Sequence, residues 1–279
     1  MRAVRALLVP AVAMALCTVP MAELGYVGAM PAAPQSLLPR PDHAGFANVN
    51  GVRIWYGIYN PKGRDTVILL HGGLGSSVDW RYQIPVLRTD HRVVVVDSRG
   101  QGRSTRSGQA ISYDLMMGDV IALMDHLKIK KAAFAGWSDG GIIGLDIAIH
   151  HPDRITRLFT YGANFSPDGL IPSSGPTFLS QLKVDVASLV DDHAATVRDV
   201  TEMWNEEPDF TPEQLAGIHV PTMIADGANE EAIKPEHTRE LAALIPGAEL
   251  AILPDVGHSG LLEDPAAFNR LLTGFLDGS

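Results

Sequence analysis

The chain has 279 residues, and its hydrophobic content of 46% is ordinary for a globular protein with a full core. Its formal net charge of -10 at pH 7 argues against nucleic acid and anionic membrane surfaces as partners, because both attract basic proteins. The length alone would suit about two domains, but α/β folds of roughly 250 residues often form one.

The N-terminus resembles a targeting segment rather than part of a fold. Two arginines precede the apolar run 6–22, which two prolines interrupt and which is short for a membrane span. We therefore predict a secretory signal peptide over residues 1–29, with an uncleaved anchor as the alternative. This predicts a secreted or periplasmic protein with no stable membrane association after signal cleavage. Cys17, the only cysteine, lies in this segment, so the mature chain would have neither a disulfide nor a cysteine nucleophile.

The next elements predict the start of a sheet. Residues 30–44 are rich in Pro and Ala and indicate a linker. Alternating runs at 45–49 and 52–59 flank an Asn-Gly pair, which is typical of a hairpin. The continuous apolar run 66–70 favours a strand buried on both faces.

A glycine-rich loop follows this strand, with the sequence His-Gly-Gly-Leu-Gly-Ser-Ser from residue 71. Such a loop exposes backbone N–H groups, so the N–H of Gly73 can point at a reacting centre; a flexible turn is the alternative. We expect His71 to anchor the loop rather than act as a base. A helix is predicted over 77–87.

The segment 97–104 follows a further predicted strand at 92–96. Its arginines and glycines suggest a phosphate cradle, but it has neither a Walker Lys-Ser/Thr pair nor G-x-G-x-x-G. A rigid turn tied by Asp97 and Arg99 is the better interpretation. Helical spacing then predicts a helix over 113–127.

The pentapeptide Gly-Trp-Ser-Asp-Gly at 136–140 lies between a buried strand at 132–135 and a helix that begins near Gly140. So tight a turn forces its central residue into a strained conformation, usually with positive φ. The hydroxyl of Ser138 is then held above the sheet, at the positive end of the following helix.

A strand at 155–161 precedes a helical lid over about 165–217, with predicted helices at 177–190 and 191–204. Four large lid side chains either line a substrate pocket or hold the lid to the body: Phe178, Leu182, Met203 and Trp204. The remaining predicted elements are a strand at 222–225, an acidic loop at 226–233, a helix at 237–244, a strand at 249–253, a loop containing His258 and a helix at 264–276.

Strands and helices alternate, which predicts a mostly parallel sheet with helices on both faces. In such sheets, sites form at the carboxyl ends of strands. Gly73, Ser138, the acidic loop and His258 all fall there.

On these motifs the chain resembles the α/β-hydrolase family over residues 45–276. The matching pieces are His71-Gly72-Gly73, Asp97-x-Arg99-Gly100-x-Gly102-x-Ser104, the Gly136–Gly140 turn and Gly257-His258-Ser259. The resemblance implies a mostly parallel eight-stranded sheet, with Ser138 as nucleophile and His258 as general base. It also implies the chain order serine, acid, histidine.

The carboxylate that would partner His258 is the least regular part of the family pattern. The family usually has G-x-x-D after the penultimate strand, and here Gly227-Ala228-Asn229-Glu230 places a glutamate in that register. We favour Glu230, with Asp226 as the competitor, and expect Asp255 to turn its loop.

The resemblance further implies an oxyanion hole from the N–H groups of Gly73 and Asp139, and it requires neither metal nor organic cofactor. Candidate substrate-binding residues are Leu74, Trp137, Asn164 and Trp204. The predicted reaction is hydrolysis of a small carboxylic ester, with a lactone or a C–C bond as alternatives. A protein of this fold that binds a ligand without catalysis is the alternative of another class.

Overall fold

The computed structural model describes residues 38–172 and 193–278. The predicted signal peptide at 1–29, most of the predicted linker, and the predicted helix at 177–190 with Phe178 and Leu182 lie outside these residues.

One sheet of eight strands forms the centre of the fold, in the order β1-β2-β4-β3-β5-β6-β7-β8. The strands are β1 (His43–Val49), β2 (Val52–Tyr59), β3 (Thr66–Leu70), β4 (Arg92–Val96), β5 (Ala132–Trp137), β6 (Ile155–Tyr161), β7 (Thr222–Gly227) and β8 (Glu249–Leu253). β2 pairs antiparallel with β1 and β4, and all other pairs are parallel. β4 follows β3 in the chain and lies on one side of it, whereas β5, the next strand, lies on the other side. The strand order therefore reverses at β3, and ligand sites form at such a reversal.

The apolar strands are continuous because both faces of the sheet are covered. Along β3, Ile68 and Leu70 enter one hydrophobic core, whereas Val67 and Leu69 enter the other. Successive side chains on a strand point to opposite faces, so a run without polar interruption supplies two cores at once.

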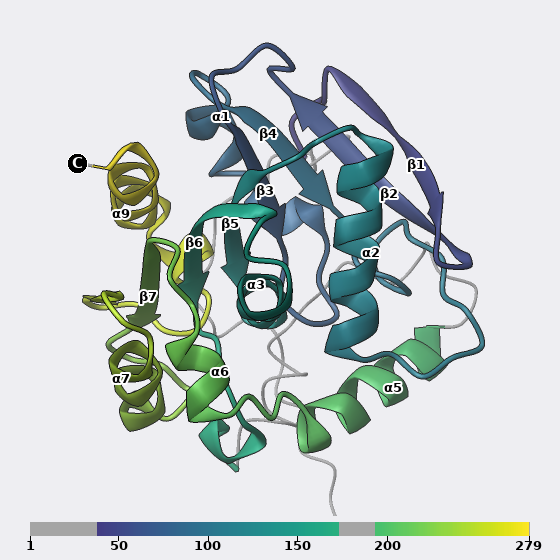
Figure 1. Cartoon of the computed structure of the whole chain (residues 1–279). Helices are drawn as coiled ribbons and strands as arrows, with labels where there is room; N and C mark the ends of the chain where they lie inside the picture. Colours follow the sequence, from purple (N-terminus) through teal and green to yellow (C-terminus); the bar gives the residue numbers. More distant parts are fainter. Residues whose placement is uncertain (1–37, 173–192, 279) are drawn as a thin grey trace, which may run out of the picture. The chain divides into compact units, whose positions relative to one another are not determined.

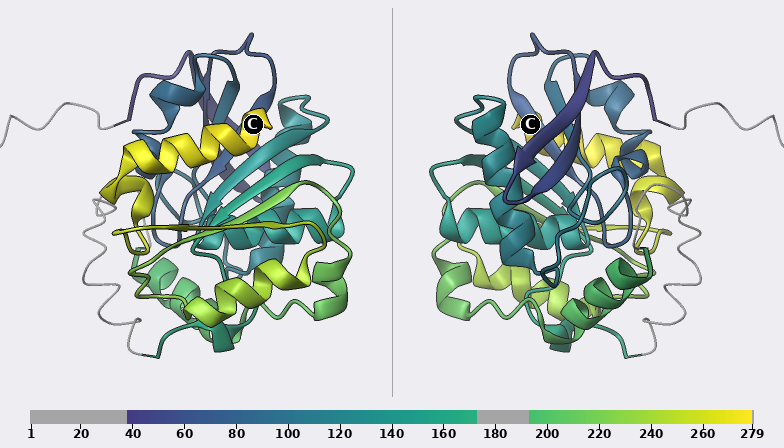
Figure 2. Two further views of the ribbon diagram at one scale, coloured as in Figure 1. Left: turned by 90° about the vertical axis from the view of Figure 1, so that its left-hand side faces the viewer. Right: turned by 90° about the vertical axis from the view of Figure 1, so that its right-hand side faces the viewer.

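Helices cover the two faces, as the views in Figures 1 and 2 show. α2 (Tyr113–His126), α3 (Asp139–His150) and α7 (Pro235–Leu244) contribute to one core. The 3-10 helix η1 (Ser77–Trp80), α1 (Ile84–Leu87), α8 (Gly260–Glu263) and α9 (Pro265–Asp277) contribute to the other. The fold class predicted from the sequence is therefore confirmed.

One predicted helix was wrong. The segment 77–87 forms η1 and α1 rather than one helix. Pro85 lies in the first turn of α1, where the missing N–H has no intrahelical partner to lose, and Pro212 has the same place in α6 (Pro212–Ala216).

The segment between β6 and β7 carries the 3-10 helix η2 (Pro167–Gly169), α5 (His193–Glu206) and α6, within the predicted lid at 165–217. α5, whose course is seen in Figure 1, is tied to the body near its middle and just past its C-terminal end. Arg106 forms an ion pair of 2.5 Å with the buried Asp199, and Glu207 accepts a hydrogen bond of 2.9 Å from the backbone N–H of Tyr113.

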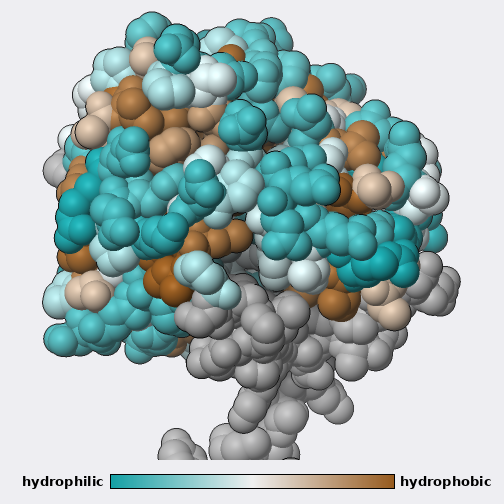
Figure 3. All heavy atoms as spheres, turned by 90° about the horizontal axis from the view of Figure 1, so that it is seen from below, coloured by the Kyte–Doolittle hydropathy of each residue, from teal (hydrophilic) through white to brown (hydrophobic). Residues whose placement is uncertain are grey.

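Hydrophilic side chains cover much of the face seen in Figure 3, with smaller apolar patches among them. Within 38–172 and 193–278, no helix is both long and apolar enough to cross a membrane.

Candidate active site

Ser138 occupies the turn between β5 and α3, and its backbone is strained as predicted, with φ 52° and ψ -119°. Its N–H donates to the carbonyl of Tyr161 at 2.8 Å. The two glycines of the motif permit this turn. A Cβ on Gly136 would collide with the backbone of Gly140, and one on Gly140 would collide with the carbonyl of Leu70. The strand and the helix can therefore pass close enough to hold the serine at the sheet edge.

His258 contacts Glu230 and not Asp226. Its Nδ1 lies 2.9 Å from Oε1 and 3.0 Å from Oε2 of Glu230, and both side chains are only 1% exposed. Nδ1 must carry a proton to bond a carboxylate, which leaves Nε2 as the ring nitrogen able to take a proton from a nucleophile. Asp226 instead accepts hydrogen bonds from the N–H of Gly227 and the hydroxyl of Thr238.

The local environment separates the pKa values of this pair. Burial disfavours the charged imidazolium, but the charge and hydrogen bond of Glu230 outweigh burial and raise the pKa of His258. Burial also opposes ionisation of Glu230, yet His258 and the backbone N–H of Ala232 lower its pKa overall. Glu230 thus remains an anion that orients the imidazole and stabilises its protonated form.

The backbone around His258 is held from several sides. Its carbonyl accepts the indole N–H of Trp137 at 2.7 Å, and its own N–H donates to Glu231 at 3.0 Å. The hydroxyl of Tyr161 donates to the carbonyl of Gly257 at 2.7 Å. Asp255 turns this loop with φ 61°, as expected. These contacts fix the position from which the ring reaches the cavity.

The glycine-rich loop after β3 lies against the serine turn. His71 accepts a hydrogen bond of 3.0 Å from the N–H of Ser98 and its Nδ1 lies 2.7 Å from the carbonyl of Gly72, which confirms the predicted anchoring role. A Cβ on Gly73 would approach Asp139 Oδ2 to 2.5 Å, so this loop and the start of α3 are in close contact. Asp139 is the first residue of α3, where N–H groups have no intrahelical partner.

The turn after β4 is also rigid, but Asp97 and Arg99 do not bond each other. Asp97 accepts from the N–H groups of Ser77 and Arg103. Arg99 forms a bidentate pair with the buried Asp119, with both contacts at 2.7 Å. The rigid turn was predicted, whereas these partners were not.

The side chain of Asp139 is a feature that the motif did not reveal. Its Oδ1 accepts hydrogen bonds of 2.9 Å from the phenol of Tyr113 and from the indole of Trp204. Its Oδ2 has no hydrogen-bond partner among the described residues. Burial raises the pKa of this carboxyl to about 6, against the two hydrogen bonds that lower it. A titrating carboxyl therefore lies beside the predicted oxyanion donors.

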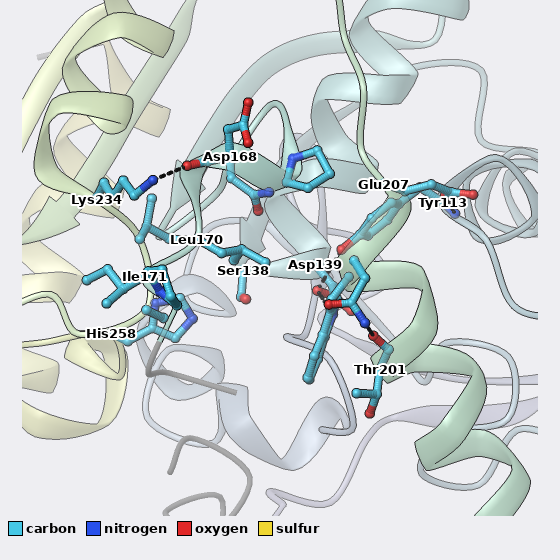
Figure 4. A pocket seen from close by; sticks show the side chains of 17 residues that line it. Tyr113, Ser138, Asp139, Asp168, Leu170, Ile171, Thr201, Glu207, Lys234 and His258 are labelled. Carbon is cyan, nitrogen blue, oxygen red and sulfur yellow. Dashed lines mark hydrogen bonds between the residues drawn. The ribbon is translucent and has the colours of Figure 1, made fainter. Parts of the chain in front are cut away.

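A cavity of about 370 Å³ opens beside Ser138 and His258 (Figure 4), and pockets of this size hold small molecules. Its lining residues come from the sheet edge, α2, α5 and the segments after β6 and β7: Tyr113, Ser138, Asp139, Asn164, Pro167, Asp168, Leu170, Ile171, Pro172, Thr201, Trp204, Asn205, Glu207, Ala232, Ile233, Lys234 and His258. In Figure 4, Ser138 is seen between His258 and Asp139.

The predicted substrate-binding residues divide into two pairs. Asn164 and Trp204 line the cavity, and Trp204 also ties α5 to Asp139, so it combines the two roles considered for it. Leu74 and Trp137 are buried and are not among the lining residues; Leu74 packs in the core and Trp137 holds the His258 backbone. Met203 packs in the core as well.

Tyr113 and Glu207 are cavity residues that the sequence reasoning missed. The two residues lie 94 positions apart and meet through the Tyr113 N–H. The only local signal was the position of Tyr113 at the start of a predicted helix. Among residues 38–172 and 193–278, no group of three or more His, Cys, Asp or Glu is placed to hold a metal ion.

Comparisons with known proteins agree with this fold. A family model described as alpha/beta hydrolase fold matches residues 65–201. The chain is 31% identical to the putative carbamate hydrolase RutD of Caulobacter sp. (strain K31), over 77% of this chain and 91% of that protein.

Two solved structures extend the likeness. The enol-lactonase from Burkholderia xenovorans LB400 is 25% identical with a TM-score of 0.71, over 84% of this chain and 100% of the other. Est816, described as an N-acyl homoserine lactone degrading enzyme, is 27% identical with a TM-score of 0.68, over 83% and 100%.

An eight-stranded, mostly parallel sheet with a strained serine turn at its carboxyl edge defines an enzyme of the hydrolase class. The chain belongs to the α/β-hydrolase family.

Proposed function

We propose that this protein is a serine hydrolase that cleaves a carboxylic ester through an acyl-enzyme intermediate. The observation that carries the proposal is the buried contact between His258 Nδ1 and Glu230, beside a cavity that both His258 and the strained Ser138 line. A histidine whose Nδ1 is committed to a carboxylate is the arrangement that a general base requires.

The reaction follows from these positions. Nε2 of His258 takes the proton of Ser138 as the hydroxyl oxygen attacks the ester carbonyl, and the N–H groups of Gly73 and Asp139 stabilise the resulting oxyanion. The protonated imidazole then gives its proton to the departing alcohol. Water, activated by the same ring, attacks the acyl-enzyme and releases the acid and Ser138.

The cavity favours an acyl group without negative charge. Its lining includes three carboxyl groups, Asp139, Asp168 and Glu207, and one lysine, Lys234, whose ammonium donates to the carbonyl of Asp168 at 2.6 Å. An anion entering the cavity would be repelled by this lining.

A lactone, which is a cyclic ester, is the second candidate within the same chemistry. It is favoured by the likeness to the structures of an enol-lactonase and of an N-acyl homoserine lactone degrading enzyme. The carbamate named for the RutD relative is a further acyl compound for the same panel. Cleavage of a C–C bond would use the same three side chains.

The test combines turnover and labelling. The wild-type protein is assayed on matched open-chain esters, lactones and carbamates of equal acyl size, and a serine-directed phosphonate should form a single adduct on Ser138. We expect Ser138→Ala to abolish turnover and labelling while the protein stays folded. Ser259→Ala, in the neighbouring loop, should retain both. Turnover that survives in Ser138→Ala would remove the assignment, and a protein with neither turnover nor adduct would be a ligand-binding protein of this fold.

A further inference from the structure

A second buried carboxyl group lies behind the His258–Glu230 pair. Asp226 is 1% exposed, at the end of β7, and its side chain is hydrogen-bonded to that of Glu230. The reaction proposed above gives Asp226 no part, because the carboxylate hydrogen-bonded to the imidazole Nδ1 is that of Glu230.

Two carboxyl groups in hydrogen-bond contact inside a protein cannot both be ionised, so one of them holds a proton. The other hydrogen bonds decide which one. Glu230 Oε1 accepts the N–H groups of Ala232 at 2.7 Å and Ile233 at 3.1 Å, in addition to His258 Nδ1. Asp226 accepts one backbone N–H and one hydroxyl. Glu230 receives more hydrogen bonds and is therefore the better-stabilised anion, so the proton resides on Asp226.

We propose that Asp226 is a positioning residue whose protonated carboxyl donates a hydrogen bond to Glu230 and holds that carboxylate against His258. The inference rests on the proposed function for its kinetic consequences, but the hydrogen bond itself does not. Asp226 touches no reacting atom and acts only through Glu230.

The groups around Asp226 set its titration. α7 supplies the hydroxyl of Thr238, at 2.6 Å, which stabilises the charged form. β6 supplies Tyr161, whose pKa is held far above its ordinary value by burial and by the nearby carboxylates. The loops supply His258, Glu230 and Glu231. The charges of the two glutamates raise the pKa of Tyr161 and that of His258. Burial, followed by Glu230, raises the pKa of Asp226, so Asp226 is neutral at pH 7.

The sign of the pH effect follows. As the pH rises through the raised pKa of Asp226, the donor is lost and two adjacent carboxylates repel each other behind the imidazole. Turnover of the wild-type protein should therefore decline at alkaline pH. Asp226→Asn, whose amide donates at every pH, should lack this decline. Thr238→Val removes a hydrogen bond to the charged form, so it should shift the decline to higher pH.

The experiment compares kcat against pH for these variants, with background hydrolysis subtracted using Ser138→Ala. Asp226→Leu, which has no donor, should lower kcat by about 10- to 100-fold at pH 7.5, the scale for a misplaced catalytic group. Asp226→Asn should restore kcat to within about threefold of wild type. Asp146→Asn, a matched change at a buried carboxyl on α3 paired with His150, should leave the alkaline decline in place.

A second readout needs no substrate. In protein labelled with ¹⁵N-histidine, the Nδ1–H resonance of His258 should shift with pH in the wild type at the same alkaline midpoint, and Asp226→Asn should abolish that step. The proposal is overturned if Asp226→Asn loses as much kcat as Glu230→Gln, or if it retains the alkaline step in either readout. A wild-type protein that turns over no substrate but shows the step contradicts the proposed function and not this hydrogen bond.

Discussion

Replacing Glu230 with glutamine tests the proposed catalytic pair most directly, because the surroundings decide how the amide must lie. Glu230 Oε1 accepts two backbone N–H groups, from Ala232 and Ile233. The glutamine carbonyl has to take that place, since an NH₂ group there would face two donors. Its NH₂ group then occupies the position of Oε2, which is 3.0 Å from His258 Nδ1.

In the Nδ1–H tautomer this NH₂ group would face the ring N–H donor to donor, even though the carbonyl at the Oε1 position lies 2.9 Å from Nδ1. The tautomer with its proton on Nε2 removes that conflict, because Nδ1 then accepts a hydrogen bond from the amide. That tautomer cannot accept the proton of Ser138, and an equivalent acid-to-amide change in a serine protease lowers kcat by about 10⁴. We expect a loss of similar size, which corresponds to about 5.5 kcal/mol of transition-state stabilisation at about 1.36 kcal/mol per tenfold.

The assay measures kcat on a short-chain p-nitrophenyl ester, with thermal unfolding to show that the variant is folded. Glu231→Gln is the matched control: its carbonyl can still accept the His258 N–H, so kcat should stay within about fivefold of wild type. If kcat of Glu230→Gln stays within about tenfold of wild type while Asp226→Asn loses nearly all of its kcat, Asp226 is the carboxylate that supports His258, and the reasoning fails.

Two further substitutions probe the oxyanion side. Gly73→Ala would place a Cβ 2.5 Å from both Asp139 Oδ2 and Trp204, displacing the loop; we expect kcat to fall by about 10². Gly108→Ala, which meets nothing within 4 Å, should not change kcat, and equal losses would refute the steric argument. Asp139→Asn should raise kcat/KM for an anionic ester over a neutral one by roughly tenfold at pH 7.5. The gain should vanish at pH 5, because the wild-type carboxyl, with its pKa at about 6, is then protonated; a gain that persists at pH 5 would contradict the charge argument.

The parts of the site that could be predicted are those that local sequence determines. The serine turn is set by two glycines within five residues, and the buried strands by short apolar runs whose length and position the structure reproduces at Thr66–Leu70 and Arg92–Val96. The G-x-x-D register similarly pointed to Glu230, which is the carboxylate that the fold brings to His258.

The parts that could not be predicted depend on contacts between distant segments. Tyr113 and Trp204 reach Asp139 from 26 and 65 positions away, and each enters through the packing of a separate helix. A helical period places a residue on a face, but it does not say which side chain of another helix that face meets. The break before Pro85 was missed as well, because a proline within a helical pattern can begin a new helix.

Two buried carboxyl groups of the site nevertheless behave differently: Asp139 follows the serine directly, and Glu230 contacts His258. Burial opposes ionisation of both, but Glu230 faces an imidazole and two backbone N–H groups, whereas Asp139 faces one phenol and one indole. The first set lowers the pKa of Glu230, and the second leaves that of Asp139 raised to about 6. Carboxyl groups whose surroundings separate their pKa values take separate roles. Glu230 therefore supplies a constant charge behind the proposed base, while Asp139 supplies a charge that appears in the cavity only above about pH 6, next to the proposed oxyanion donors. The acidic side of the pH profile should consequently depend on the charge of the substrate, because protonation of His258 stops turnover for every ester while protonation of Asp139 helps only an anionic one.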